Sequence, residues 1–334
     1  MPPYSASSVP NVRSARFQLP SSRILDWHPD GPHVVAFNNA LSVFFPLGEN
    51  FFIDSVRAHR HVVLAGTPLE AQVEAFCRQE AFHSREHELY NDALRPYLPV
   101  AFAETVLNVV LGFFKRVSWA LCLAGTVGLE HMTSTLGATL LMDGGAALEG
   151  CEPHFEALWR WHALEECEHK AVAFDVFEAA YGKGVGAYAL RVFGFLVSQL
   201  LFFALFAPLF LYAVVRAGAL FNGASWLALF RHHCKFGRAK FCARLARPKT
   251  APPQTRQRPN RPRTKTPAAN PTRAGAGGGK GLIRRVLGLY ASFFRFGFHP
   301  WHDHDNAEDL RRESARFEER KAELSLFRAK ARAD

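Results

Sequence analysis

The sequence has little cysteine and no CxxC pair. Its six cysteines are scattered, which argues against a disulfide scaffold and against a cysteine-type zinc site. The first 20 residues lack the apolar stretch of a cleavable signal peptide. Alternation of apolar and polar residues, which indicates strands, is nearly absent between residues 34 and 180. Because unpaired cysteines are typical of a reducing compartment, we expect a cytoplasmic protein. Because strand-like alternation is nearly absent, we expect the all-α class.

Acidic residues are missing from a long basic segment. Residues 244–285 hold 12 Lys and Arg and no Asp or Glu, so leaving these charges out turns the net charge of +10 into −2. Residues 248–281 are also rich in Pro and Gly and cannot bury a core. They can contact anionic lipid or nucleic acid. Because no aromatic residue interleaves the arginines, we favour a solvated linker and expect no nucleic-acid partner.

Apolar residues make up 49 % of the 334-residue chain, so a sizeable core can form. The first 20 residues are polar and are expected to be flexible. Shifts in composition then divide the chain into five parts: a flexible arm at 1–20, a helical bundle at 21–182, hydrophobic helices at 183–243, a disordered basic linker at 244–281 and a C-terminal helical region at 282–334.

The bundle region predicts four long helical stretches. Local signals mark their ends: Thr67-Pro68-Leu69-Glu70 is a helix start, with Thr as the N-cap and Pro at the first helical position. Pro46 predicts a kink in the first stretch. The stretches lie at about 34–60, 67–94, 101–142 (one helix or a pair) and 153–180.

Residues 192–215 form a run of 24 residues without a charge, longer than the roughly 20 residues that cross a bilayer. A second uncharged run follows at 217–230, and the Lys and Arg beyond it would hold that end on the cytoplasmic side. Two interpretations remain open. Residues 192–230 either anchor the protein to the inner membrane or form a buried helix of a large α-domain.

Two glutamates occupy otherwise uncharged helical stretches. Glu49 is the only Asp, Glu, Lys or Arg between Val34 and Ile53, and Glu130 is the only one between 117 and 142. An ionised Glu in such surroundings must be paired, hydrogen-bonded or bound to metal, or else it is protonated. Taken alone, either glutamate could mark a helix end or be a protonated core acid.

Two ExxH motifs point to a metal centre. Glu80 and His83 share one helix face, as do Glu166 and His169, and His162 extends the second motif by one turn. Four carboxylates can offset the charge of two divalent cations, two of them by bridging, while imidazoles occupy terminal positions. This is the ligand pattern of di-iron and di-manganese carboxylate bundles. The predicted metal ligands are Glu49, Glu80, His83, Glu130, His162, Glu166 and His169, and the four glutamates are also expected to act in catalysis.

Other polar residues are expected to have supporting or structural roles. Glu165 and Asp175 are candidate partners for the outer nitrogens of the histidine ligands. His87, one turn beyond His83, could support the ligands or lie at the surface. His131 is about 100° round its helix from Glu130 and should face elsewhere. The cluster His299, His302 and His304 looks like a metal-binding tract, but we expect it to be structural.

The segments that carry these residues resemble a bacterial family of predicted metal-dependent hydrolases. The resemblance covers most of residues 20–305 apart from the low-complexity insert. It implies a metal-dependent enzyme. The segments are FFPLGENFF (44–52), RQEAFHSREH (78–87), GLEHMTSTL (128–136), WRWHALEECEHKAVAFDVF (159–177) and FHPWHDHD (298–305).

The ligand pattern is also similar to that of the p-aminobenzoate N-oxygenase group of ferritin-like di-iron enzymes. There a lone Glu, an ExxH, a second lone Glu and an HxxxExxH supply seven ligands, which fall by motif on the seven residues named above. The similarity implies a ferritin-like bundle and oxygen activation at two iron ions. It is confined to the ligands, so the substrate and the reaction do not transfer.

Three functions follow as hypotheses. The first is an oxygenase with two iron ions (alternatively manganese), an electron donor and an apolar small-molecule substrate, since oxygen-rich ligand sets suit these metals better than zinc. The second is a metal-dependent hydrolase that activates a metal-bridging water. The third is a non-enzymatic metal-binding protein at a membrane. A membrane surface suits an apolar substrate, and the oligomeric state is left open.

Overall fold

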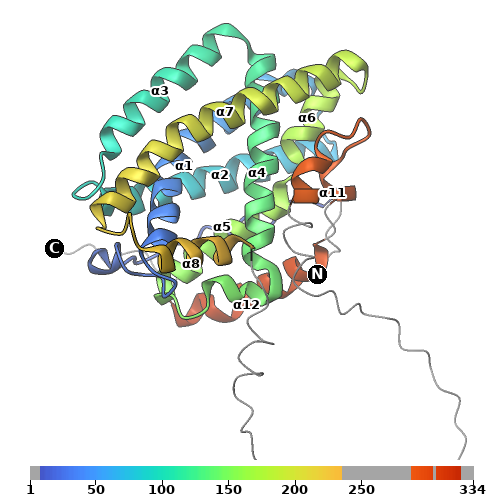
Figure 1. The fold of residues 1–334 in the computed structure, drawn as a ribbon. Helices are drawn as coiled ribbons and strands as arrows, with labels where there is room; N and C mark the ends of the chain where they lie inside the picture. The colour runs from blue at the N-terminus through green and yellow to red at the C-terminus, as the bar shows by residue number, and fades with distance from the viewer. Residues whose placement is uncertain (1–7, 235–286, 304–305, 325–334) are drawn as a thin grey trace, which may run out of the picture.

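The structure, a computed structural model, describes residues 8–234, 287–303 and 306–324. Over these residues it consists of helices and connecting loops, and the described part contains no strand (Figure 1). The all-α bundle expected from the sequence is therefore confirmed. The basic segment 244–281 and His304 lie outside the described residues, so the expectations for them stay predictions.

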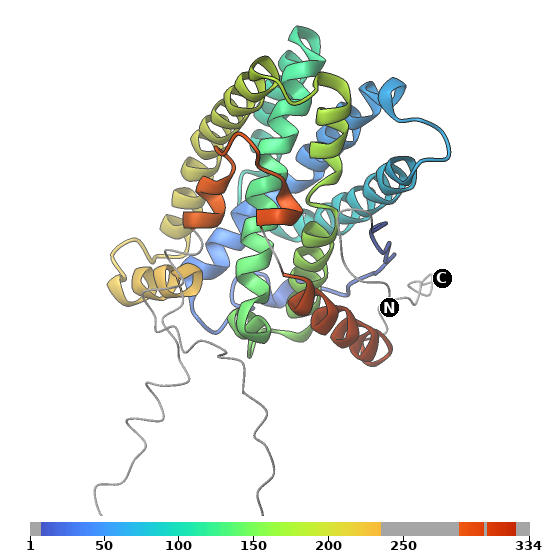
Figure 2. The same ribbon diagram turned by 90° about the vertical axis from the view of Figure 1, so that its right-hand side faces the viewer.

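Four central helices carry the candidate ligands: α1 (Pro32–Ala58), α2 (Pro68–Leu94), α4 (Trp119–Gly145) and α5 (Pro153–His169). The other helices flank them: α3 (Val100–Val117), α6 (Val172–Tyr181), α7 (Val185–Arg216), α8 (Gly223–Cys234), α11 (Pro300–Asp303) and α12 (Ala307–Glu323). Short 3₁₀ turns complete the fold: η1 (Ser21–Arg23), η2 (Arg60–Val62) and η3 (Ala146–Leu148). The C-terminal helix α12 packs against α4 and α5 (Figure 2).

Capping side chains set the helix boundaries. Thr67 accepts a hydrogen bond from the Glu70 N–H through its hydroxyl, at 3.4 Å, as the start signal predicts. Ser118 caps α4 in the same way, so the third expected stretch is a pair of helices. The stretch expected as one helix at 153–180 also divides, because α5 ends at His169 and α6 begins three residues later.

Pro46 lies inside α1, which continues past it as one helix. Because proline has no N–H, the Ser42 carbonyl one turn earlier loses its helical donor. Asn91 on α2 replaces that donor, since its side-chain Nδ2 donates to the Ser42 carbonyl at 3.1 Å. The expected kink therefore does not interrupt the helix, and the proline creates a tie between α1 and α2.

Small residues let α7 pack closely against α4, and the two helices adjoin in both views (Figures 1 and 2). A Cβ atom added to Gly194 would lie 2.5 Å from the Cβ of Ala124. One added to Gly128 would lie 2.8 Å from the Cα of Phe195. These positions need glycine because any side chain would push the helices apart. One long side of α7 is thereby fixed to the bundle.

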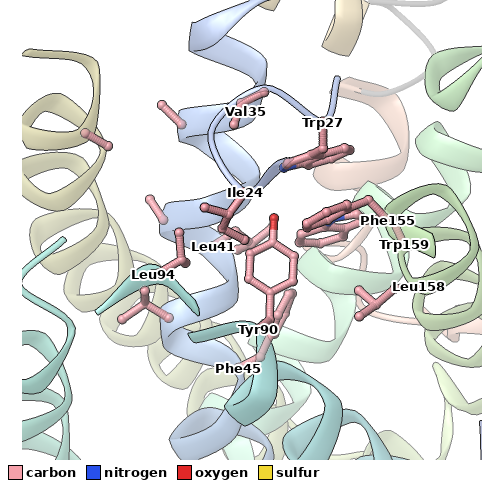
Figure 3. Packing of buried hydrophobic residues seen from close by; sticks show 14 of the residues in the cluster. Ile24, Trp27, Val35, Leu41, Phe45, Tyr90, Leu94, Phe155, Leu158 and Trp159 are labelled. Atoms are coloured by element: carbon pink, nitrogen blue, oxygen red, sulfur yellow. The ribbon is translucent and has the colours of Figure 1, made fainter. Parts of the chain in front are cut away.

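An aromatic cluster fills the space between α1, α2 and α5 (Figure 3). Trp27 stacks on Phe155 with ring centroids 5.2 Å apart, and Tyr90 meets Phe155 edge-on at 5.4 Å. Asn39 accepts hydrogen bonds from both the Tyr90 hydroxyl (2.6 Å) and the Trp27 ring N–H (3.2 Å). Phe45 at the edge of this cluster packs against the candidate ligands, so the cluster gives them a rigid wall.

Residues 8–20 belong to the segment expected to be a flexible arm, yet they lie against the bundle. Arg13, Ala15 and Phe17 are buried, while the residues between them are exposed. The Phe17 N–H donates to Glu86 at 2.9 Å, and the Phe17 ring lies 5.3 Å from that of Trp161. The expectation is therefore corrected for these residues: every second side chain anchors an extended segment to the helices.

We predict that Gly194→Val destabilises the fold by about 1–3 kcal/mol, because the new side chain cannot fit against Ala124. The midpoint of thermal unfolding, followed by circular dichroism, measures the effect. Gly186→Ala in the same helix is the control, since nothing lies within 4 Å of its added Cβ. Equal melting temperatures for the two variants would show that the close helix approach is unimportant.

Candidate metal centre

Seven side chains converge in the interior between α1, α2, α4 and α5. None of them is more than 4 % exposed. The ExxH and HxxxExxH spacings place the residues of α2 and of α5 on one face of each helix. The structure brings together every residue that the sequence pattern singles out; that these residues bind metal stays a prediction. They are Glu49 from α1, Glu80 and His83 from α2, Glu130 from α4, and His162, Glu166 and His169 from α5.

The ligand atoms fall into two groups, and within each group they lie no more than 4.8 Å apart. Atoms that share one ion at about 2.1 Å can be at most about 4.2 Å apart, so small shifts would close each group around a cation. The first group is Glu49, His83, His162 and Glu166, and the second is Glu80, Glu130 and His169.

Two carboxylates reach across both groups. Glu166 places Oε1 at 3.1 Å from His162 Nε2 and Oε2 at 3.6 Å from His169 Nε2. Glu80 places Oε1 at 3.1 Å from His169 Nε2 and Oε2 at 4.0 Å from His83 Nδ1. Glu166 and Glu80 are therefore placed to bridge two ions, whereas Glu49 and Glu130 are placed to bind at the ends.

The buried atoms that face the centre make no hydrogen bond. A buried polar atom without a partner is costly, and a buried carboxylate is more so. A bound cation would satisfy all of these atoms at once, so the donor set fits a metal centre. The atoms are Glu49 Oε1, both oxygens of Glu80, Glu130 and Glu166, His83 Nδ1, His162 Nε2 and His169 Nε2.

Each histidine uses its other ring nitrogen for a hydrogen bond within the protein. Such bonds fix the tautomer and the orientation of a metal-binding imidazole. The sequence predicted Glu165 as such a partner and left His87 open between a supporting and a surface position, whereas it did not single out Gln79. The bonds join His83 Nε2 to Glu165 Oε2 (3.1 Å), His162 Nδ1 to His87 Nε2 (2.9 Å) and His169 Nδ1 to Gln79 Oε1 (3.0 Å).

A chain of hydrogen bonds behind His162 runs back to the Pro46 tie. If His162 binds metal through Nε2, its Nδ1–H donates to His87 Nε2. The Nδ1–H of His87 then donates to the Ser42 hydroxyl at 2.9 Å, which donates to Asn91 Oδ1 at 2.8 Å. Every member is buried, so this chain holds one orientation of the His162 ring.

Arg13 joins the supports of the other two histidines. Its guanidinium bonds to Glu165 at 3.3 Å and to Glu168 at 2.7 and 2.9 Å. Glu165 supports His83, and Glu168 accepts a hydrogen bond from the Gln79 amide (3.3 Å) that supports His169. One residue of the N-terminal segment therefore couples ligands on α2 and α5.

Burial sets the ionisation of the candidate ligands. It raises the pKa of Glu49, Glu80 and Glu130 well above the usual value, and neighbouring carboxylates raise it further. Burial lowers the pKa of His83, so that imidazole is neutral and can bind a metal. Burial also raises the pKa of Glu166, but the adjoining His162 and His169 outweigh it and hold that pKa well below the usual value.

Burial raises the pKa of Glu165 to about 8, although the nearby Arg13 guanidinium lowers it. Burial also lowers the pKa of His87 well below its usual value, so this ring is neutral and can accept from His162 while it donates to Ser42. His87 is therefore a neutral hydrogen-bond partner of His162, and Glu165 is a partner that can share a proton with His83.

An apolar cavity of about 100 Å³ reaches Glu49 from the side of α3 and α7. Its walls come from α1, α3, α4 and α7 and include Phe44, Phe114 and Leu201. Glu49 is the one charged side chain in these walls, and the hydroxyls of Thr133 and Ser198 are the other polar groups besides the Cys122 thiol. A second cavity, of about 60 Å³, reaches His162 and Glu166. The site is thus open to small apolar molecules.

Other candidate residues lie apart from the ligands. His131 faces away from them, as expected, and packs against Phe293 and Phe298 with ring centroids 5.1 Å away. Asp175 does not support a ligand histidine; it accepts a hydrogen bond from His299 Nε2 at 3.0 Å. The His299 and His302 rings lie 4.7 Å apart. His299 therefore attaches the C-terminal region to α6, which agrees with a structural role.

We predict that metal binding releases protons. In the metal-free protein the raised pKa values of Glu49, Glu80 and Glu130 favour the protonated carboxyls, and a cation must displace the protons held there. The apparent affinity for Fe²⁺ should therefore rise as the pH rises, because fewer protons then compete with the cation. Anaerobic calorimetry in buffers with different ionisation heats counts the protons, and Glu130→Gln should release fewer. Heats that do not depend on the buffer contradict this prediction.

We predict that Arg13→Ala weakens Fe²⁺ binding by about 10- to 100-fold, because the supports of His83 and His169 lose their common partner. Arg16→Ala is the matched control, since Arg16 lies on the same segment but is exposed. Iron titration under anaerobic conditions gives both affinities. The role assigned to Arg13 is wrong if the two variants bind iron equally well.

The comparisons with known proteins agree with this geometry. The model of a family described as predicted metal-dependent hydrolase matches residues 11–304, a range that includes all seven candidate ligands and Arg13. No curated protein and no solved structure matches the chain, so the likeness to the p-aminobenzoate N-oxygenase group rests on the ligand pattern alone. The chain belongs to the predicted metal-dependent hydrolase family.

Proposed function

We propose that this protein is a dinuclear iron enzyme that oxidises an apolar small molecule with dioxygen. The observation that carries the proposal is the buried set of four carboxylates and three imidazoles at the end of an apolar cavity. The four negative charges would balance two divalent ions in an interior that tolerates no net charge. Oxygen-rich ligand sets of this kind suit iron or manganese better than zinc.

The residues divide the work of binding between them. Glu49, His83 and His162 would hold one ion, Glu130 and His169 would hold the other, and the bridging carboxylates Glu80 and Glu166 would contact both. Two iron ions, when bound, would supply electrons for the reduction of dioxygen. The hydrogen-bonded supports behind the three histidines hold the rings in place and spare them from reorganising during turnover.

The cavity walls would bind the substrate by its apolar surface and exclude water from the site. Oxidation of a C–H bond to an alcohol consumes one dioxygen, two electrons and two protons, and the second oxygen atom leaves as water. The two electrons must come from an external donor, so the proposal includes a redox partner.

Hydrolysis of an ester or an amide is the second candidate, which the description of the family favours. A hydrolase must also stabilise a developing oxyanion and protonate a leaving group. The walls of the larger cavity offer two hydroxyls and one carboxyl for these tasks, and most of their surface is hydrocarbon. This composition favours a substrate without polar groups at the reacting position, and hence oxidation.

We predict that the purified protein binds about two iron ions per chain and that Glu130→Ala loses most of them, because Glu130 is a terminal ligand of the second group. Metal analysis after anaerobic loading measures both. Glu88→Ala, which removes an exposed carboxylate from α2, should keep its iron. Full metal content in Glu130→Ala would remove the basis of the proposed function.

We also predict that the reduced, iron-loaded protein reacts with dioxygen. A transient visible absorption band after rapid mixing with oxygen, and oxygen consumption with an added reductant, are the expected results. Ester hydrolysis that proceeds equally well without oxygen or reductant, with manganese or zinc in the site, supports the hydrolase instead. Iron-loaded protein that gives neither a band nor oxygen consumption rules out the oxygenase.

A further inference from the structure

We propose that an exposed apolar face on α3 and α7 docks onto the surface of an anionic phospholipid bilayer without crossing it. We also infer that the larger cavity takes a lipid-soluble substrate with a hydrocarbon chain directly from that surface. The docking is independent of the proposed function, whereas the statement about the substrate rests on it.

The face is built from exposed apolar side chains on two helices that contact each other. On α7 the exposed row is Phe193, Leu196, Leu200 and Phe203, which recur every three or four residues and therefore share one side of the helix. On α3, which contacts α7, Val109 and Phe113 are exposed one turn apart. Leu200 is 72 % exposed and Val109 is 67 % exposed. Exposed apolar side chains gathered on neighbouring helices in this way are typical of an interaction site.

By length and composition α7 could cross a membrane, but the contacts on its opposite side favour a helix that lies along the membrane surface. Arg191 is buried against the bundle and donates to the Arg295 carbonyl at 2.9 Å, and Gln199 donates to the Gly128 carbonyl at 3.3 Å. The Gln199 bond and the close Gly194 contact join α7 to α4, and the Arg191 bond joins α7 to the segment around Arg295. To cross a bilayer alone, α7 would have to give up all of them. We therefore expect α7 to lie in the membrane–water interface, with one side held by the bundle and its apolar side toward the lipid.

The charges at the ends of the face favour an anionic lipid surface. Arg116 at the end of α3 and Arg216 at the end of α7 are exposed, and α7 carries no acidic residue. Glu104, the one acidic residue of α3, is bound by Arg95 at 3.0 Å. An apolar face bordered by arginines matches hydrocarbon beside phospholipid phosphate groups. A protein partner of ordinary composition would carry both positive and negative charges along the rim of its interface, whereas an anionic bilayer offers negative charge.

The cavity lies directly behind this face. Phe114 and Leu201 line the cavity, and each follows an exposed residue of the face, Phe113 and Leu200 respectively. Apart from the buried Leu107 and Gly194, the lining residues of α3 and α7 are half-buried, so little more than a single layer of side chains separates the cavity from the surface. The far end of the same cavity is Glu49. A hydrocarbon chain passing between α3 and α7 would reach the candidate metal centre without entering water.

Flotation with vesicles tests the docking. Full-length metal-free protein is mixed with vesicles of phosphatidylglycerol and phosphatidylcholine in equal parts, or of phosphatidylcholine alone. We expect the wild-type protein to bind the anionic vesicles, and part of this binding to persist in high salt. In Leu200→Glu and Phe113→Glu the binding should weaken about tenfold or more. Leu89→Glu, an exposed leucine on α2, is the control and should bind like the wild type. Wild-type protein that stays unbound, or equal binding by all variants, overturns the proposal.

Three further measurements separate the remaining outcomes. Sedimentation without vesicles should show the wild type and Leu200→Glu in the same oligomeric state. Self-association of the wild type that Leu200→Glu abolishes would instead assign the face to a second copy of the chain. Fluorescence of cis-parinaric acid, a hydrocarbon-chain probe, should report binding that Leu201→Trp weakens by filling the cavity while vesicle binding stays unchanged. Vesicle binding without probe binding overturns the substrate inference alone. Oxygen consumption of iron-loaded Leu200→Glu without vesicles should equal that of the wild type, which separates this proposal from the proposed function.

Discussion

The repulsion between four buried carboxylates is the constraint on which the rest of this structure depends. Glu49, Glu80, Glu130 and Glu166 lie close together in the interior. Of their carboxylate oxygens only Glu49 Oε2 takes part in a hydrogen bond, which it accepts from the Ser84 hydroxyl at 3.0 Å. Protonation relieves part of the repulsion, as the raised pKa values show. Two cations would relieve all of it. The site is therefore costly to the metal-free fold and stable once its charge is balanced.

The surrounding structure holds these side chains in place against that repulsion. Each histidine ring is fixed from behind: His83 by Glu165, His169 by Gln79, which in turn donates to Glu168, and His162 by His87 and Ser42. Arg13 joins Glu165 to Glu168. The missing N–H of Pro46 draws Asn91 into the same chain. Features that look unrelated in the sequence, a proline within a helix and a basic residue in the N-terminal segment, thus support the same four-helix centre.

The two sides of the molecule have different character. The side around α5 is closed by Arg13, by the N-terminal segment and by α12, whose Glu313 pairs with Arg160 at 3.0 Å. The side around α3 and α7 is apolar, with an exposed outer surface and a cavity behind it. This asymmetry gives a polar, rigid support on one side of the candidate centre and an apolar approach on the other. An enzyme for a lipid-soluble substrate needs both.

The sequence by itself determined the ligand types, the helices that carry them and most of the helix starts, because these depend on spacings of three or four residues and on capping within one turn. It also predicted Glu165 as a supporting partner and left His87 open. It missed Gln79, although a position four residues before His83 puts Gln79 on the same helix face. The tertiary structure alone decided that residues 8–20 pack, that Arg13 meets a glutamate 152 residues away, and which side of α7 is exposed. Those outcomes depend on which elements meet in space, and no local pattern records the partner of a residue that lies on another helix.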